Sequence, residues 1–171
     1  MFYRIKQFIW AINSNFQVID KEYINSILDK EEQSLFYSLI KSEQFHCLRV
    51  SYDLVRTFGN EKGINRDELA KLGLLHDIGK KGLNIGPIKK SIFVILKKII
   101  GVSIKDYSIF RNINLYYNHP FKGTNILREN NSTLYSREFL EAIEMHHQGI
   151  KEISKSKNKY LIYLNICDNR N

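Results

Sequence analysis

The stretch LAKLGLLHDIGKKG, residues 69–82, predicts more about the fold of this 171-residue chain than any other part of it. Its leucines at positions 69, 72 and 75 have the spacing of one face of an α-helix. Asn65 and Glu68 precede this face as a capping box. His76 and Asp77 follow at its apolar end, with Gly79 two residues further on. The pattern predicts a buried helix that ends in two polar side chains.

Helical spacing continues on both sides of this stretch, and alternating strand patterns between tight turns are scarce. We therefore expect an all-α fold, a single-domain helical bundle of about seven to nine helices over residues 1–171. Residues 1–30 would form an N-terminal helical extension. The expected helices run from a cap at Asp20 to 28, from Asp29 to about 41, from about 44 to a stop at Gly59, through 69–76, from a first-turn proline at Pro87, from another at Pro120, from Ser136 to 147, and from about 158 to 168.

Composition and charge limit the kinds of partner. The net charge of +8 favours anionic partners such as nucleotides, nucleic acid or an acidic membrane surface, and a lysine-rich solvated face explains it equally well. Two cysteines, Cys47 and Cys167, cannot form a disulfide framework, which fits a reducing compartment. No run reaches the roughly 18 apolar residues of a membrane span, and no signal-peptide cleavage site follows the first residues. We expect a soluble cytoplasmic protein.

The five histidines form a pattern with metal-binding chemistry. They include two adjacent pairs, His76-Asp77 and His146-His147, and each pair closes the apolar part of a helix with a glycine two residues beyond. Adjacent helical residues point about 100° apart, so they converge on one metal cluster most easily where the helix ends. Imidazole and carboxylate together suit iron, manganese, zinc or similar divalent ions. A single histidine is usually a core or surface residue, but this arrangement favours a metal centre.

Five segments in order resemble the HD superfamily of metal-dependent phosphohydrolases. FHCLRVSYDLV (45–55) resembles the first-histidine helix of that family, and LAKLGLLHDIGKKG resembles its HD-I-G-K signature. NHPFKGTNIL (118–127) resembles the H-P-x-x-G element, IEMHHQG (143–149) the tandem-histidine helix, and LNICDNRN (164–171) the closing aspartate helix. The resemblance implies an HD domain over about residues 31–171, of the subset that binds two metals.

The resemblance also implies the ligands. The first metal would be held by His46, His76, Asp77 and Asp168. The second would be held by His119, His146 and His147, with the Asp77 carboxylate bridging both ions. Iron or manganese would be the first choices, and zinc, nickel, cobalt or magnesium the alternatives.

Such a centre implies hydrolysis of a small nucleotide or related phosphate ester, by a phosphomonoesterase or a phosphodiesterase. Two cations that share a water lower its pKa and present hydroxide to phosphorus, with Asp77 as the catalytic carboxylate. Lys80, three residues after Asp77, would place an ammonium on the scissile phosphate, or is simply solvated. Arg49, three residues after His46, would contact phosphate or pair with a buried carboxylate. We expect Cys47 and Cys167 to be buried on the opposite sides of their helices from the ligands.

Other functions and partners stay open. A di-iron oxygenase of the same fold would use closely similar ligands, and a non-catalytic module would use metal only to stabilise a binding surface. Nucleic acid is not an expected partner, because no nucleic-acid-binding signature is present. The tandem histidines are followed by Gln148, Gly149 and Ile150. The cyclic-di-GMP phosphodiesterases have a glutamate and a Gly-Tyr-Pro loop there, so the substrate is not identified.

The segment 87–104 combines lysine pairs at 89–90 and 97–98 with dense apolar residues. A buried helix with lysine stems that reach solvent explains this pattern. A lid over the metal site and a helix on a membrane surface are the alternatives. Lys97 and Lys98 exclude a spanning helix.

Overall fold

The computed structural model describes residues 18–82, 107–131 and 134–171. These residues form eight α-helices and one 3-10 turn, without a strand among them, so the predicted all-α class is confirmed. Pro87, the segment 87–104 and the first 17 residues lie outside the described part. The elements are α2 (Lys21–Ile27), α3 (Lys30–Tyr37), α4 (Lys41–Phe58), α5 (Arg66–Leu75), η1 (Ile78–Lys80), α7 (Tyr107–Asn131), α8 (Arg137–Met145), α9 (Ile150–Ile153) and α10 (Lys159–Arg170).

Polar side chains cap five of the helices where the sequence predicts a start. Each cap accepts a hydrogen bond from a backbone N–H of the first turn, which typically contributes about 1 kcal/mol. The five caps are Asp20, Asp29, Asn65, Ser136 and Asn158. One of these caps is a reciprocal capping box, which was not predicted from the sequence. It joins Asp29 to Glu32 at the start of α3.

The predicted capping box at Asn65 is half wrong. The Asn65 side chain accepts from the backbone of the first turn, but the Glu68 carboxylate does not return to the Asn65 backbone. Instead it accepts hydrogen bonds from Ser136 Oγ at 2.6 Å and from Tyr160 Oη at 2.9 Å. Tyr160 Oη in turn accepts from the Asn65 N–H. Because these partners come from α8 and α10, tertiary contacts have replaced the local bond.

The boundary between α3 and α4 lies earlier than predicted. The second helix ends at Tyr37, not near residue 41, and α4 begins at Lys41. Leu39 is buried in the turn between them. The Gln44 side-chain amide donates to the carbonyl oxygens of Leu39 and Tyr37, at 2.7 and 3.2 Å. The burial of one leucine and this side-chain bond therefore turn the chain before the helical pattern runs out.

Pro120 lies inside α7 and does not begin a helix. Its ring removes a backbone N–H and crowds the carbonyl four residues earlier, which usually ends or kinks a helix. Helix α7 nevertheless runs through it, and its His119–Gly123 turn packs directly on η1. This close packing between elements outweighs the local preference.

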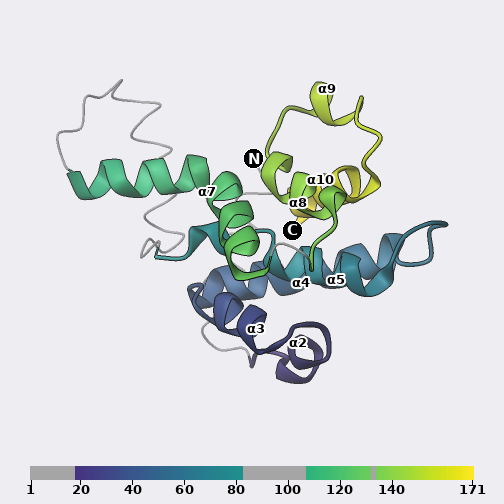
Figure 1. Ribbon diagram of the computed structural model, residues 1–171, viewed down its shortest axis with the longest axis horizontal. Coiled ribbons are helices and arrows are strands. Elements are labelled where there is room, and N and C mark those ends of the chain that lie inside the picture. Colours follow the sequence, from purple (N-terminus) through teal and green to yellow (C-terminus); the bar gives the residue numbers. More distant parts are fainter. Residues whose placement is uncertain (1–17, 83–106, 132–133) are drawn as a thin grey trace.

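Helix α5 lies at the centre of the described fold (Figure 1), with α4 alongside it, α2 and α3 on one side, and α8 and α10 on the other. Leu69, Leu72, Leu74 and Leu75 are all fully buried, as expected for a helix covered on every side. Gly73 lets α4 approach closely, because a Cβ there would lie 2.4 Å from the Ser51 Cα. The C-terminal end of this central helix is therefore surrounded by other helices.

Among the described residues, no helix has the length and apolar character needed to cross a lipid bilayer.

Candidate metal centre

The site begins where α5 ends. His76 is the C-terminal cap of α5, and Asp77 directly precedes η1. Both side chains are fully buried, with exposed fractions of 0% and 1%. The helix ends at this pair, as predicted, and its end places the two adjacent side chains in one buried region.

Two of the buried imidazoles are oriented as metal ligands usually are. His76 Nδ1 donates to the Gly73 carbonyl oxygen at 2.9 Å, and His146 Nδ1 donates to the Ile143 carbonyl oxygen at 2.6 Å. A backbone carbonyl that binds Nδ1–H fixes the tautomer and leaves the Nε2 lone pair for a cation. Both bonds run three residues back along the helix, so the helix end itself orients each ring.

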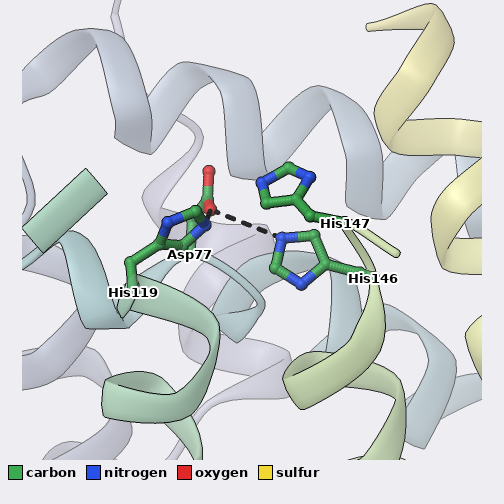
Figure 2. A group of neighbouring side chains, drawn as sticks. All are labelled: Asp77, His119, His146 and His147. Atoms are coloured by element: carbon green, nitrogen blue, oxygen red, sulfur yellow. Dashed lines mark ion pairs between the residues drawn. The ribbon is translucent and has the colours of Figure 1, made fainter. Parts of the chain in front are cut away.

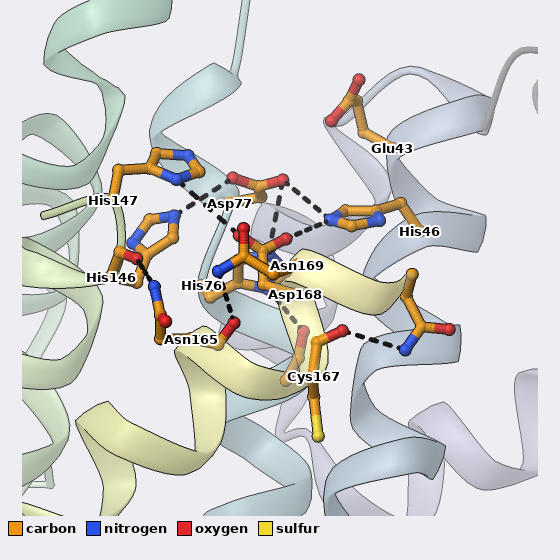
Figure 3. Close-up of polar contacts among 12 residues, drawn as sticks. Glu43, His46, His76, Asp77, His146, His147, Asn165, Cys167, Asp168 and Asn169 are labelled. Atoms are coloured by element: carbon orange, nitrogen blue, oxygen red, sulfur yellow. Dashed lines mark hydrogen bonds and ion pairs between the residues drawn. The ribbon is translucent and has the colours of Figure 1, made fainter. Parts of the chain in front are cut away.

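The first group of potential ligands joins α4, the end of α5 and α10 (Figure 3). His46 Nε2 lies 3.0 Å from Asp168 Oδ1, and His76 Nε2 lies 3.7 Å from the same oxygen. Asp77 Oδ2 lies 3.4 Å from His76 Nε2 and 3.7 Å from His46 Nε2. This oxygen of Asp77 therefore faces the first group.

The second group joins Asp77 to α7 and the C-terminal end of α8 (Figure 2). His119 Nε2 lies 3.1 Å from Asp77 Oδ1, and His146 Nε2 lies 3.9 Å from the same atom. His147 completes the group from the exposed side, and its Nδ1 lies 3.7 Å from Asp168 Oδ2. The two oxygens of Asp77 thus face different histidine groups, and those of Asp168 do the same.

Several ligand atoms are buried without a hydrogen bond. His76 Nε2, His146 Nε2 and Asp77 Oδ1 have no hydrogen-bond partner within the described part of the chain. Leaving a buried polar atom unsatisfied costs about 1–3 kcal/mol. A bound cation removes this cost, and a set of imidazole nitrogens and carboxylate oxygens suits divalent transition metals. The residues present therefore fit a metal centre.

The carboxylates are held in their ionised form. Burial opposes the charge on Asp77, but Lys80 and His76 outweigh burial and hold the pKa of Asp77 well below its ordinary value. Burial also opposes the charge on Asp168, and its hydrogen bond with His46 is the main reason that its pKa is well below the usual range. Both groups are therefore negative at neutral pH.

The tandem histidines are held neutral. Burial, together with the neighbouring His147, keeps the pKa of His146 well below its ordinary value. Burial lowers the pKa of His147 to about 4. For His76, burial favours the neutral ring, but the adjacent Asp77 outweighs it and raises the pKa. Burial therefore keeps His146 and His147 in the neutral form that binds a cation.

Among the described residues of the site, His147 is the most exposed. His76, His119 and His146 are completely buried, whereas the side chain of His147 is 46% exposed. His46 and Asp168 are partly exposed, at 14% and 11%. The described part of the cluster is therefore most accessible to solvent at His147.

Lys80 lies in this cluster rather than in solvent. Its Nζ lies 2.5 Å from Asp77 Oδ2 and 3.0 Å from Glu43 Oε2. Burial opposes its charge, but Asp77 and Glu43 outweigh burial and raise the pKa of Lys80. Sequence reasoning missed Glu43. The available signal is its place on α4, one turn before His46 and on the same face.

The remaining predicted residues lie nearby. Arg49 is partly buried on α4, one turn after His46, and its predicted contact with phosphate stays a prediction.

Cys47 and Cys167 are fully buried, as predicted, and burial raises the pKa of both thiols. The Cys47 sulfur, however, lies within 4.8 Å of ligand atoms of His76 and Asp77. Because α4 packs closely on α5, Cys47 faces the end of α5 and not the opposite side of its helix.

These features define an all-α domain whose central helix ends in a cluster of potential metal ligands. The family model of the HD domain matches residues 45–170, and the chain belongs to that family. HD domains bind divalent metals, and the superfamily is one of metal-dependent phosphohydrolases. No curated protein and no solved structure matches the chain.

Proposed function

We propose that this protein is a phosphohydrolase that uses two divalent cations. One would be bound by His46, His76, Asp77 and Asp168, and the other by Asp77, His119, His146 and His147. The observation that carries this proposal is the position of Asp77. Its Oδ1 lies 3.1 Å from His119 Nε2, and its Oδ2 lies 3.4 Å from His76 Nε2, so one carboxylate serves both groups.

The pair of cations, when bound, would supply Lewis acidity and an activated water for attack on phosphorus. The chain's own residues prepare the site for this chemistry. The buried imidazoles are oriented by backbone carbonyls, and the ionised carboxylates supply negative charge. The exposed edge at His147 admits the phosphate group. Lys80 lies beside Asp77, where its ammonium would neutralise the negative charge that develops on the phosphate group.

The substrate we propose is a small phosphate ester, such as a nucleotide. Among the described residues of the second group His147 is exposed, and the other histidines are completely buried. The chain carries a net charge of +8, which attracts anions. A monoester and a diester fit this description equally, so both belong in the test.

Metal content is the first test. Wild type, Asp77→Ala and His147→Ala would be purified anaerobically and their metals measured by elemental analysis. We expect two ions per chain in wild type, none in Asp77→Ala, and only the first ion in His147→Ala. Asp67→Ala, an exposed aspartate in the first turn of α5, is the matched control. Equal metal content in all four proteins would contradict the bridging role of Asp77.

Activity is the second test. The metal-loaded proteins would be assayed for release of phosphate or nucleotide from a panel of nucleotides, and of nitrophenol from p-nitrophenyl phosphate and bis-p-nitrophenyl phosphate. We expect hydrolysis by wild type and by Asp67→Ala, and none by Asp77→Ala. A fully metallated wild type that hydrolyses nothing across the panel, or that consumes oxygen instead, would overturn the proposal.

A further inference from the structure

Lys80 is a buried cation with two anionic partners. Its side chain is only 9% exposed, and it lies between Asp77 Oδ2 on one side and Glu43 Oε2 on the other. An ammonium taken out of water is strongly unfavourable unless carboxylates surround it. The two partners come from different elements, since Glu43 lies on α4 and Asp77 directly precedes η1.

The two carboxylates are not equivalent. Asp77 Oδ2 also faces His76 Nε2 at 3.4 Å and His46 Nε2 at 3.7 Å, so it is the oxygen that a cation in the first group would use. A cation bound there draws on the same negative charge that holds the ammonium. Glu43 lies outside every group of potential metal ligands in the described residues, so a cation in the first group would leave its bond to Lys80 in place.

We propose that Glu43 is a positioning residue that holds Lys80 in place when metal occupies the first group. The inference rests on the proposed function. With Glu43 present, Asp77 Oδ2 can bind a cation without leaving the ammonium of Lys80 buried and unpaired. Without it, Asp77 is the remaining carboxylate that the structure shows bonded to the ammonium, and the ammonium competes directly with the metal for that oxygen.

The position of Glu43 on α4 supports this role. It precedes His46 by three residues, so one face of the helix presents both an expected ligand of the first ion and the anchor of Lys80. The Glu43 side chain is 12% exposed, and its bond to Lys80 crosses 37 residues of sequence. The geometry thus fixes the ammonium at the edge of the first group, on the side of α4.

The test uses Mn²⁺ binding, which does not depend on activity. Free Mn²⁺ would be titrated against the purified protein and followed by its electron paramagnetic resonance signal. In Glu43→Gln we expect the Kd of the first ion to rise by about tenfold or more, since an unpaired buried charge is strongly unfavourable. Glu31→Gln, an exposed glutamate in the first turn of α3, is the matched control and should bind as wild type does.

A double-variant cycle identifies the cause. Lys80→Met removes the competing ammonium, so adding Glu43→Gln to it should leave Mn²⁺ binding unchanged. Glu43→Asp keeps the charge, and it should weaken binding less than Glu43→Gln does. The proposal is wrong if Glu43→Gln binds Mn²⁺ with wild-type affinity, or if it weakens binding equally in the Lys80→Met background.

Hydrolysis gives a separate readout. If Glu43 acts through Lys80, Glu43→Gln and Lys80→Met should lower kcat at saturating Mn²⁺ by similar factors, and the double variant should be no slower than Lys80→Met alone. A wild type that binds two Mn²⁺ ions but hydrolyses nothing would contradict the proposed function. It would leave the Mn²⁺-binding result on Glu43 intact, so the two failures are distinguishable.

Discussion

Replacing Gly79 with alanine should remove the second metal and spare the first. A Cβ at position 79 would lie 1.9 Å from the His119 carbonyl oxygen and 2.6 Å from the Gly123 nitrogen. Real Cβ atoms essentially never approach closer than 3.0 Å, so α7 must move away from η1 by about 1 Å or more. His119 moves with α7, whereas His46, His76 and the rest of the first group lie on other elements.

The expected loss follows from the tolerance of metal coordination. Ligand distances hold to about 0.2 Å, so a shift of this size takes His119 out of range. Loss of a supporting contact alone typically lowers metal affinity about 10- to 100-fold, and we expect at least the upper end here. Overpacking should also lower the free energy of unfolding by about 1–3 kcal/mol.

Elemental analysis and denaturant unfolding with circular dichroism would measure both effects. Gly123→Ala is the graded variant, because its Cβ would meet the Gly79 nitrogen at 3.2 Å, a contact that a shift of a few tenths of an ångström relieves. Gly82→Ala is the control. Gly82 has φ +86° and open space around its Cβ position, so it strains the backbone without displacing α7. Two ions of wild-type affinity in Gly79→Ala would refute the steric argument, and so would equal losses in all three variants.

Three further outcomes are expected. Burial favours the neutral form of Asp53, but hydrogen bonds, chiefly from Arg170, hold its pKa below the ordinary value. Asp53→Asn should therefore lower the free energy of unfolding by about 2 kcal/mol at pH 7. In urea unfolding, the difference between the variant and wild type should shrink as the pH falls below about 4, through the folded-state pKa of Asp53. A difference that stays constant with pH would contradict the lowered pKa. Tyr135→Phe removes the hydrogen bond to Glu32, 2.9 Å long and buried, and should cost about 1–2 kcal/mol in the same assay, whereas no change would show that this bond does not stabilise the fold. A chelator should lower the melting temperature of wild type but not that of Asp77→Ala, and an equal response in both proteins would exclude the proposed centre.

Local signals predicted the helix starts well. Asp20, Asp29 and Ser136 cap helices because their side chains accept hydrogen bonds from backbone N–H groups of the same turn. Such an interaction is local in sequence, so the neighbouring residues are enough to predict it. Non-local contacts explain the errors. Pro120 lies in the middle of a helix because α7 packs on η1. Glu68 accepts hydrogen bonds from the hydroxyl groups of Ser136 and Tyr160 instead of completing the predicted capping box.

The candidate site shows the same division. The paired histidines and aspartates were recognisable because the sequence places them at helix ends, and the structure brings all seven predicted ligands together. The bond between Glu43 and Lys80 was not predictable in the same way, because it depends on how α4 packs beside η1. Spacing placed Lys80 on the right face but could not show that two carboxylates already surround it.

The ligands come from widely separated parts of the chain, and this has a consequence for stability. His46 and Asp168 are 122 residues apart, and the histidines between them come from the end of α5, from α7 and from α8. A cation bound among them would act as a removable cross-link that only the assembled helices can close. It would strengthen the whole domain by mass action, and α10 could not detach from α4 without releasing it. Hydrogen exchange in α10 would therefore report metal occupancy.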